Sequence, residues 1–189
     1  MSQIDAPTSE ARLLANMARA YVGLDRHEEA VESARAAVTA ARSSGNVPCL
    51  ADTLYQLGVV LRSTGEPGEA AVHLREAHQL YRAHQHPIWE GYSLARLAAC
   101  LLADGQFAGA AEAAEESLSI AQEIEAAYCQ GMANAALGEA LLELGQPSRG
   151  LACLQEALTV FTRLGVPEAQ PVQDLIDSRH TEPSPPPAP

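Results

Sequence analysis

The chain has 189 residues and a net charge of −12, which is long enough for one domain or for a short array of repeats. A charge of this sign repels phosphate backbones and argues against direct binding to nucleic acid. All 12 basic residues are arginine, which excludes mechanisms that need a lysine of this chain, such as a P-loop or a Schiff base.

The first ten residues, MSQIDAPTSE, have neither a basic start nor an apolar stretch. We expect residues 1–10 to be a flexible N-terminus without a secretory signal. No apolar run reaches the roughly 18 residues that a membrane helix needs. The four cysteines form no CxxC pair, so we expect free, mostly buried thiols in a cytoplasmic protein.

One sequence pattern then recurs along the chain. The stretch LGVVLRSTGEPGEAAVHLREA at 57–77 returns in similar form at 97–117 and 137–157, with a weaker copy at 17–37. The turn residues Asp25, Gly65, Gly105 and Gly145 are each 40 positions apart. Self-similarity at a fixed period predicts a repeat solenoid, with units at about 11–50, 51–90, 91–130 and 131–170.

Each unit predicts two helices joined by a tight turn. The first helix carries apolar or small residues at i, i+3, i+4 and i+7, and in the second unit these are Leu54, Leu57, Gly58 and Leu61. A glycine in the turn permits a left-handed backbone. The second helix repeats a small residue, which is Ala30, Ala70, Ala110 or Gly150. We expect the two helices of each unit to cross closely at these small residues.

The end of the chain changes character after the fourth unit. Residues 171–180 predict a short cap helix, which would cover the apolar face of the last repeat. Residues 181–189, TEPSPPPAP, are rich in proline. We expect them to form a disordered tail.

The pattern Leu57–Gly58–x2–Leu61…Gly65…Ala70…Leu74…Ala77 resembles the tetratricopeptide repeat, with its usual period of 34 extended to 40. The resemblance implies an all-α fold, an α-solenoid of four helical hairpins with a C-terminal cap helix. A looser resemblance links the alanine-rich, lysine-free repeats to the C-terminal sensor region of actinobacterial-type multidomain transcriptional regulators.

These resemblances imply a scaffold that binds proteins or peptides, as a regulatory or sensor module in bacterial signalling or transcription control. The alternative is a ligand-sensing receptor whose groove binds a signalling peptide or a small molecule. In this family the first helices line the inner groove. The predicted partner-binding residues of the groove are Arg12, Asn16, Arg19, Tyr55, Gln56, Arg62, Tyr92, Arg96, Glu139 and Glu143.

The residues of this groove indicate a partly acidic partner. Arginines dominate its N-terminal part, and guanidinium groups pair with carboxylates through two parallel hydrogen bonds. Glu139 and Glu143 mark the other end. The competing interpretation is that all these side chains are ordinary solvated polar groups on helices.

Motifs of enzymes are incomplete in this chain. The stretch HEEAV at 27–31 lacks the second histidine that a zinc hydrolase needs. The stretch GYSLA at 91–95 lacks the last glycine and the preceding strand of a nucleophile elbow. We interpret His73, His78, His84 and His86 as surface histidines. We therefore expect no catalytic activity, no metal site and no cofactor.

Overall fold

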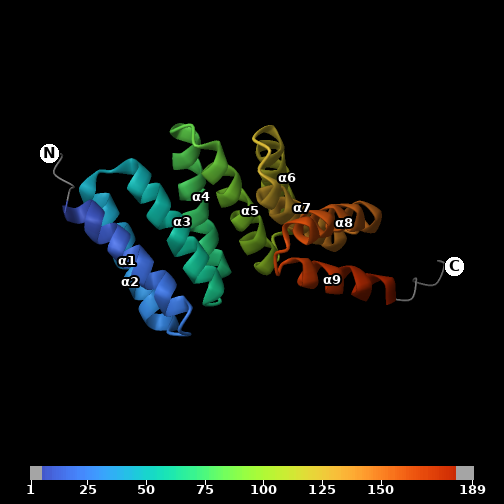
Figure 1. Cartoon of the computed structure of the whole chain (residues 1–189), viewed down its shortest axis with the longest axis horizontal. Helices are drawn as coiled ribbons and strands as arrows, with labels where there is room; N and C mark the ends of the chain where they lie inside the picture. Colours follow the sequence, from blue (N-terminus) through green and yellow to red (C-terminus); the bar gives the residue numbers. More distant parts are fainter. Residues whose placement is uncertain (1–5, 182–189) are drawn as a thin grey trace.

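The computed structural model describes residues 6–181, with side chains as far as residue 179. All the regular elements in this part of the chain are α-helices (Figure 1). They are α1 (Ala6–Val22), α2 (His27–Ser44), α3 (Val47–Ser63), α4 (Pro67–Ala83), α5 (Pro87–Ala103), α6 (Phe107–Glu123), α7 (Ala127–Glu143), α8 (Pro147–Leu164) and α9 (Ala169–Thr181).

The first eight helices form four antiparallel hairpins that stack along the long axis of the molecule (Figure 1). Each helix packs on the next one in the chain, and α1 also contacts α3 while α5 contacts α7. The first helices of successive hairpins therefore lie beside one another. This arrangement confirms the predicted all-α solenoid.

The turn inside each hairpin has the same geometry in all four units. Asp25, Gly65, Gly105 and Gly145 have φ values of 55°, 89°, 73° and 73°. The residue after each of them donates its N–H to a carbonyl five positions earlier, as from Glu66 to Leu61 over 2.8 Å. This bond satisfies a carbonyl at the end of the helix. The left-handed turn predicted from the spacing of 40 is confirmed.

A second left-handed position recurs between the hairpins, 20 residues after the first. The residues there are Gly45, Gln85, Glu125 and Gly165, with φ values of 66°, 56°, 56° and 66°. The linkers that begin at these positions recur in the sequence, but they do not predict a left-handed residue, because only two of the four are glycine. Side chains other than glycine are uncommon at positive φ.

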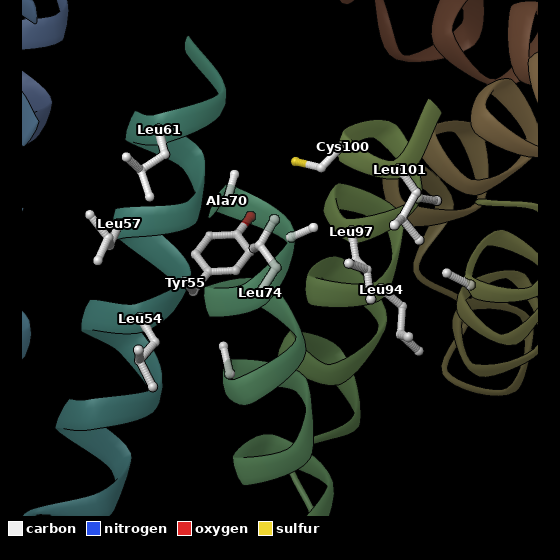
Figure 2. Close-up of a cluster of buried hydrophobic side chains, with 14 of the residues drawn as sticks. Leu54, Tyr55, Leu57, Leu61, Ala70, Leu74, Leu94, Leu97, Cys100 and Leu101 are labelled. Carbon is white, nitrogen blue, oxygen red and sulfur yellow. The ribbon is translucent and has the colours of Figure 1, made fainter. Parts of the chain in front are cut away.

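A continuous apolar core runs through the stacked hairpins. Figure 2 shows Leu54, Leu57 and Leu61 on successive turns of α3, with Leu94, Leu97 and Leu101 in the same places on α5. These six side chains are at most 5% exposed. The same cluster extends from Ala18 in α1 to Leu141 in α7, so the hairpins share one core.

Three details differ from expectation. α1 begins at Ala6, within the stretch expected to be flexible, and α9 runs over Ala169–Thr181 rather than 171–180. Residues 1–5 and 182–189, with most of the proline-rich tail, lie outside the described residues. His78 is buried in α4 instead of lying on the surface.

None of the helices described is both long and apolar enough to cross a membrane.

Candidate binding face

A hollow of about 340 Å³ opens at the N-terminal end of the stack, and we call it the N-terminal hollow. Side chains of α1, α3, α4 and α5 form its wall. Five of the predicted groove residues meet there, and Asp52, Tyr81 and Trp89 join them. The lining includes Arg12, Asn16, Arg19, Asp52, Tyr55, Gln56, Tyr81 and Trp89.

Asp52 and three aromatic rings give this hollow a fixed wall. The hydroxyl of Tyr81 donates to Oδ1 of Asp52 over 2.7 Å. Burial raises the pKa of Tyr81, and the hydrogen bond to Asp52 raises it further. Trp89 is 43% exposed, and its ring centroid lies 5.6 Å from that of Tyr55 and 6.2 Å from that of Tyr81. Tyr55 is itself buried in the core, so it supports Trp89 more than it meets solvent.

A larger hollow of about 550 Å³ lies at the other end, and we call it the C-terminal hollow. It brings together three predicted residues, Arg62 from α3 with Glu139 and Glu143 from α7. Helix α9 supplies a wall that the sequence did not predict. The apolar lining includes Ala99, Leu102, Met132, Leu142, Phe161, Val172 and Leu175.

Some charged side chains of the C-terminal hollow have an ion pair or a hydrogen bond, and others have neither. Glu143 forms an ion pair of 3.0 Å with Arg179 of α9, and Glu168 accepts a hydrogen bond from the Tyr128 hydroxyl. Within the described part of the chain, Glu139 and Arg62 have neither an ion pair nor a side-chain hydrogen bond. These two opposite charges are therefore open to a ligand.

The environment of Glu139 disfavours its charged form. Solvent reaches this side chain from the open side of the hollow, yet the surrounding protein atoms raise the pKa of its carboxyl. Arg62 lowers that pKa and Glu143 raises it. A cation that entered the hollow would stabilise the carboxylate.

Aromatic rings connect the two hollows in an unbroken line. Trp89 lies 5.9 Å from Tyr92, Tyr92 lies 6.3 Å from Tyr128, and Tyr128 lies 5.9 Å from Phe161, measured between ring centroids. The chain has only eight aromatic residues, and six belong to this line when Tyr55 and Tyr81 are included. Of these six, only Tyr55 and Tyr92 were predicted. One signal was available, since Tyr81 and Phe161 hold equivalent positions in units two and four.

The predicted residues Tyr92 and Arg96 lie on α5 between the hollows and line neither of them. Burial raises the pKa of Tyr92, and the charge of Arg96 lowers it. The charge of Arg96 also lowers the pKa of Tyr128, which burial and the hydrogen bond to Glu168 raise. The Nε atom of Arg96 is buried and has no hydrogen-bond partner in the described structure.

Four arginines of the second helices are paired between hairpins, whereas Arg75 and Arg163 have no ion pair among the described residues. Arg35 contacts Glu69 at 2.8 Å, and Arg42 contacts Glu76 at 3.0 Å. Arg82 pairs with Glu116, and Arg149 approaches Glu115 at 3.8 Å. Each of these pairs joins residues 34 positions apart. They connect second helices of neighbouring hairpins.

The arginines of the predicted groove are not paired in this way. Among the residues described, its four arginines form no ion pair; they are Arg12, Arg19, Arg62 and Arg96. The two hollows, Tyr92 and Arg96 together form what we call the inner face. This face keeps four arginine charges without a carboxylate partner, on a chain whose net charge is −12.

Comparison with known proteins finds similar repeats. The tetratricopeptide repeat model matches residues 9–83. The chain is 33% identical over 168 residues to the regulatory protein AfsR of Streptomyces griseus, a match that covers 89% of this chain and 16% of that protein. It therefore spans only about a sixth of that relative's length.

Solved structures share the fold at low sequence identity. The Rap conjugation gene regulator of plasmid pLS20, in complex with the Phr* peptide, superposes with a TM-score of 0.74 at 16% identity, covering 97% of this chain and 50% of that one. A signal transduction ATPase with numerous domains and a tetratricopeptide repeat sensor, from Pyrococcus horikoshii, superposes with a TM-score of 0.73 at 14% identity, covering 84% of this chain and 25% of that one.

Among the described residues, no group of three histidine, cysteine or acidic side chains could hold a metal ion.

Proposed function

We propose that the inner face of these repeats, of which residues 9–83 match the tetratricopeptide repeat model, binds an extended, partly acidic peptide segment of a partner protein. The module acts without catalysis, as a sensor or regulatory part of a bacterial cytoplasmic signalling or transcription-control system. Its resemblance to a regulatory protein supports this role.

The observation that carries the proposal is the set of four unpaired arginines on the inner face. An arginine without a counter-ion gains a charge-assisted hydrogen bond when a carboxylate arrives. The outer arginines Arg35 and Arg42 already have such partners. An acidic segment therefore gains more on the inner face than on the outer helices.

The aromatic line supports an extended occupant instead of a compact one. Trp89, Tyr92 and Tyr128 belong to a surface that continues from one hollow to the other. Tyrosine and tryptophan offer large, rigid contact areas at a low cost in conformational entropy. The structural similarity to a regulator described in complex with a peptide is in line with this mode of binding.

A small-molecule receptor is the second candidate function. The C-terminal hollow of about 550 Å³ falls in the range of small-molecule sites, and its wall is mainly apolar with a few charged groups. Compounds that bind only the folded chain would raise its melting temperature. A thermal-shift screen of metabolites that gives such a rise would support this second function.

The test of the peptide function is a selection from a library of random 12-residue peptides displayed on phage, with the purified chain immobilised. The selected peptides should be enriched in acidic residues. Their affinity is then measured by calorimetry and by the fluorescence of Trp89, the sole tryptophan of the chain. Arg96→Ala should weaken binding about tenfold to a hundredfold, because a well-placed charged hydrogen bond contributes about 1.5–3 kcal/mol.

The matched control is Arg163→Ala, which removes an exposed arginine of α8 that also has no ion pair among the described residues. It should leave affinity unchanged. Arg19→Ala serves as a second inner-face variant, because this side chain is exposed and its loss does not threaten the fold. Equal effects of Arg19→Ala and Arg163→Ala, or a selection without acidic enrichment, would contradict the proposal.

A further inference from the structure

We propose that the C-terminal hollow receives a lysine side chain of the bound peptide, with its ammonium group at Glu139, while carboxylates of the same peptide occupy the arginines of α1. This inference rests on the proposed function. It assigns an order of charges to the partner, an acidic end at the N-terminal hollow and a basic, apolar end at the C-terminal hollow.

The lining of the C-terminal hollow matches a long aliphatic chain that ends in a cation. Ala99, Leu142 and Leu175 belong to its apolar wall, and a lysine stem packs along such a surface while its ammonium group stays hydrated. Glu139 belongs to the same lining and is exposed. The hollow thus offers apolar contact and an available carboxylate to one side chain.

The other acids of this hollow are already engaged. Arg179 holds Glu143, and the Tyr128 hydroxyl donates to Glu168. Glu139 is the carboxylate of the described lining that has neither an ion pair nor a side-chain hydrogen bond, whereas Glu168 uses one oxygen for Tyr128 and keeps Oε2 buried without a partner. The charge of Arg62 lowers the pKa of Glu139, but the two side chains form no ion pair. An incoming ammonium group relieves the unfavourable environment of this carboxylate.

The N-terminal hollow has the opposite balance. Arg12 and Arg19 belong to its wall, with Asp52 as the acid among its lining residues, and Asp52 already accepts the hydrogen bond of Tyr81. The lining of the N-terminal hollow thus has two arginines and one acid, whereas that of the C-terminal hollow has three glutamates and two arginines. A peptide with separated charges complements both ends.

The distance between the ends sets the spacing in the peptide. From α1 to α7 there are three steps between first helices, and packed helices lie about 8–10 Å apart, which gives roughly 27 Å. An extended chain advances about 3.3–3.6 Å per residue. About eight residues should therefore separate the acidic group from the lysine.

The experiment uses four synthetic peptides with blocked ends, so that no free amino terminus can replace the lysine. The first has two glutamates, a neutral spacer of about eight residues, a leucine and a lysine. The second carries norleucine instead of lysine, which keeps the stem and removes the charge. The third peptide has the composition of the first, and the fourth has the composition of the second. In both, the two glutamates stand next to the leucine. Affinities are measured by NMR titration of the isotope-labelled chain, which detects weak binding.

On the unmodified chain, the first peptide should bind about fivefold to tenfold more tightly than the second and the third, as expected for one accessible charge pair in a partly desolvated site. The advantage of lysine over norleucine should vanish with Glu139→Gln. It should persist with Glu156→Gln, a matched change at an exposed acid of α8.

The two proposals fail in different ways. If the lysine advantage is absent, or survives Glu139→Gln, the lysine assignment is wrong while the peptide function stands. If the third peptide equals the first, the separated order of charges is wrong. If these four peptides do not bind but selected acidic peptides do, the charge order is again wrong. If neither group binds, the proposed function itself fails.

Discussion

At the scale of single residues, the fourth unit contains a helix crossing that has no room for a larger residue. Glycine occupies both contact positions there, Gly138 in α7 and Gly150 in α8, whereas the second unit combines Gly58 with Ala70. A Cβ atom built on Gly150 would lie 2.8 Å from the carbonyl oxygen of Gly138. A backbone oxygen cannot move aside as a side chain can. The two helices therefore depend on hydrogen atoms at both positions.

We predict that Gly150→Ala destabilises the chain by about 1–2 kcal/mol. Overpacking costs about 1–3 kcal/mol, and the better helix propensity of alanine offsets up to about 1 kcal/mol of it. The measurement is the free energy of unfolding in urea. Gly109→Ala is the control, because its Cβ would meet only the Leu101 side chain at 3.6 Å. That variant should be stabilised by about 0.5 kcal/mol, and equal stability of the two variants would contradict the crossing.

At the scale of elements, α9 has two roles. Val172 and Ile176 are 7% and 5% exposed and pack in one cluster with Leu154 and Phe161 of α8, so α9 covers the last hairpin. Its residues Leu175 and Arg179 also line the C-terminal hollow. The terminal helix therefore completes both the core and the candidate site. At the opposite end, Leu13 and Leu24 remain 61% and 65% exposed.

We expect Ile176→Ala to lower the free energy of unfolding by about 2–5 kcal/mol, as is usual when a large aliphatic side chain is removed from a core. The variant should also scatter more light on heating, because the last hairpin loses its cover. Asp174→Ala provides the comparison on the same helix, since Asp174 is exposed and accepts one hydrogen bond from Gln170. Its effect should stay within about 0.5 kcal/mol. Similar losses in both variants would show that α9 does not act as a cap.

At the scale of the whole molecule, a shared core connects hairpins that are local units in sequence. The buried cluster continues from Ala18 to Leu141, and ion pairs such as Arg35–Glu69 join neighbouring hairpins on the outside. Exposed pairs of this kind contribute at most about 1 kcal/mol each. The apolar core, not the ion pairs, therefore couples the hairpins.

The continuous core predicts a single cooperative unfolding transition. Trp89 reports on the middle of the stack, whereas far-UV circular dichroism reports on all helices. The midpoints of the two signals in urea should coincide. A dichroism midpoint at lower urea would mean that a terminal hairpin unfolds separately, as repeat arrays do when the coupling between neighbours is weak.

Much of the fold could be predicted because its determinants are local and repeated. The turn at Gly65 needs a left-handed residue and a carbonyl five positions before Glu66, and the stripe of Leu54, Leu57 and Leu61 lies on one side of a single helix. Such features depend on residues within two turns of one another. Four copies at a spacing of 40 then distinguish them from chance.

The candidate site was predictable only in part. The position of a residue in the repeat indicated which side chains turn inward, and the structure brings Arg12, Asn16 and Arg19 around one hollow. The position of a residue in the repeat cannot show which of the inward-facing charged side chains form an ion pair. Nothing in the sequence separates Glu143 from Glu139, yet Glu143 forms an ion pair with Arg179 of α9 and Glu139 forms none in the described structure.

Local pattern in the chain therefore determined the helices, the turns inside the hairpins, the stacking and the inner set of polar residues. Tertiary structure alone decided the line from Trp89 to Phe161, the wall contributed by α9, and the division between paired and unpaired arginines. The physical reason is distance along the chain. Trp89 and Phe161 are 72 positions apart and belong to one line of rings only because the hairpins stack and place Tyr92 of α5 and Tyr128 of α7 between them.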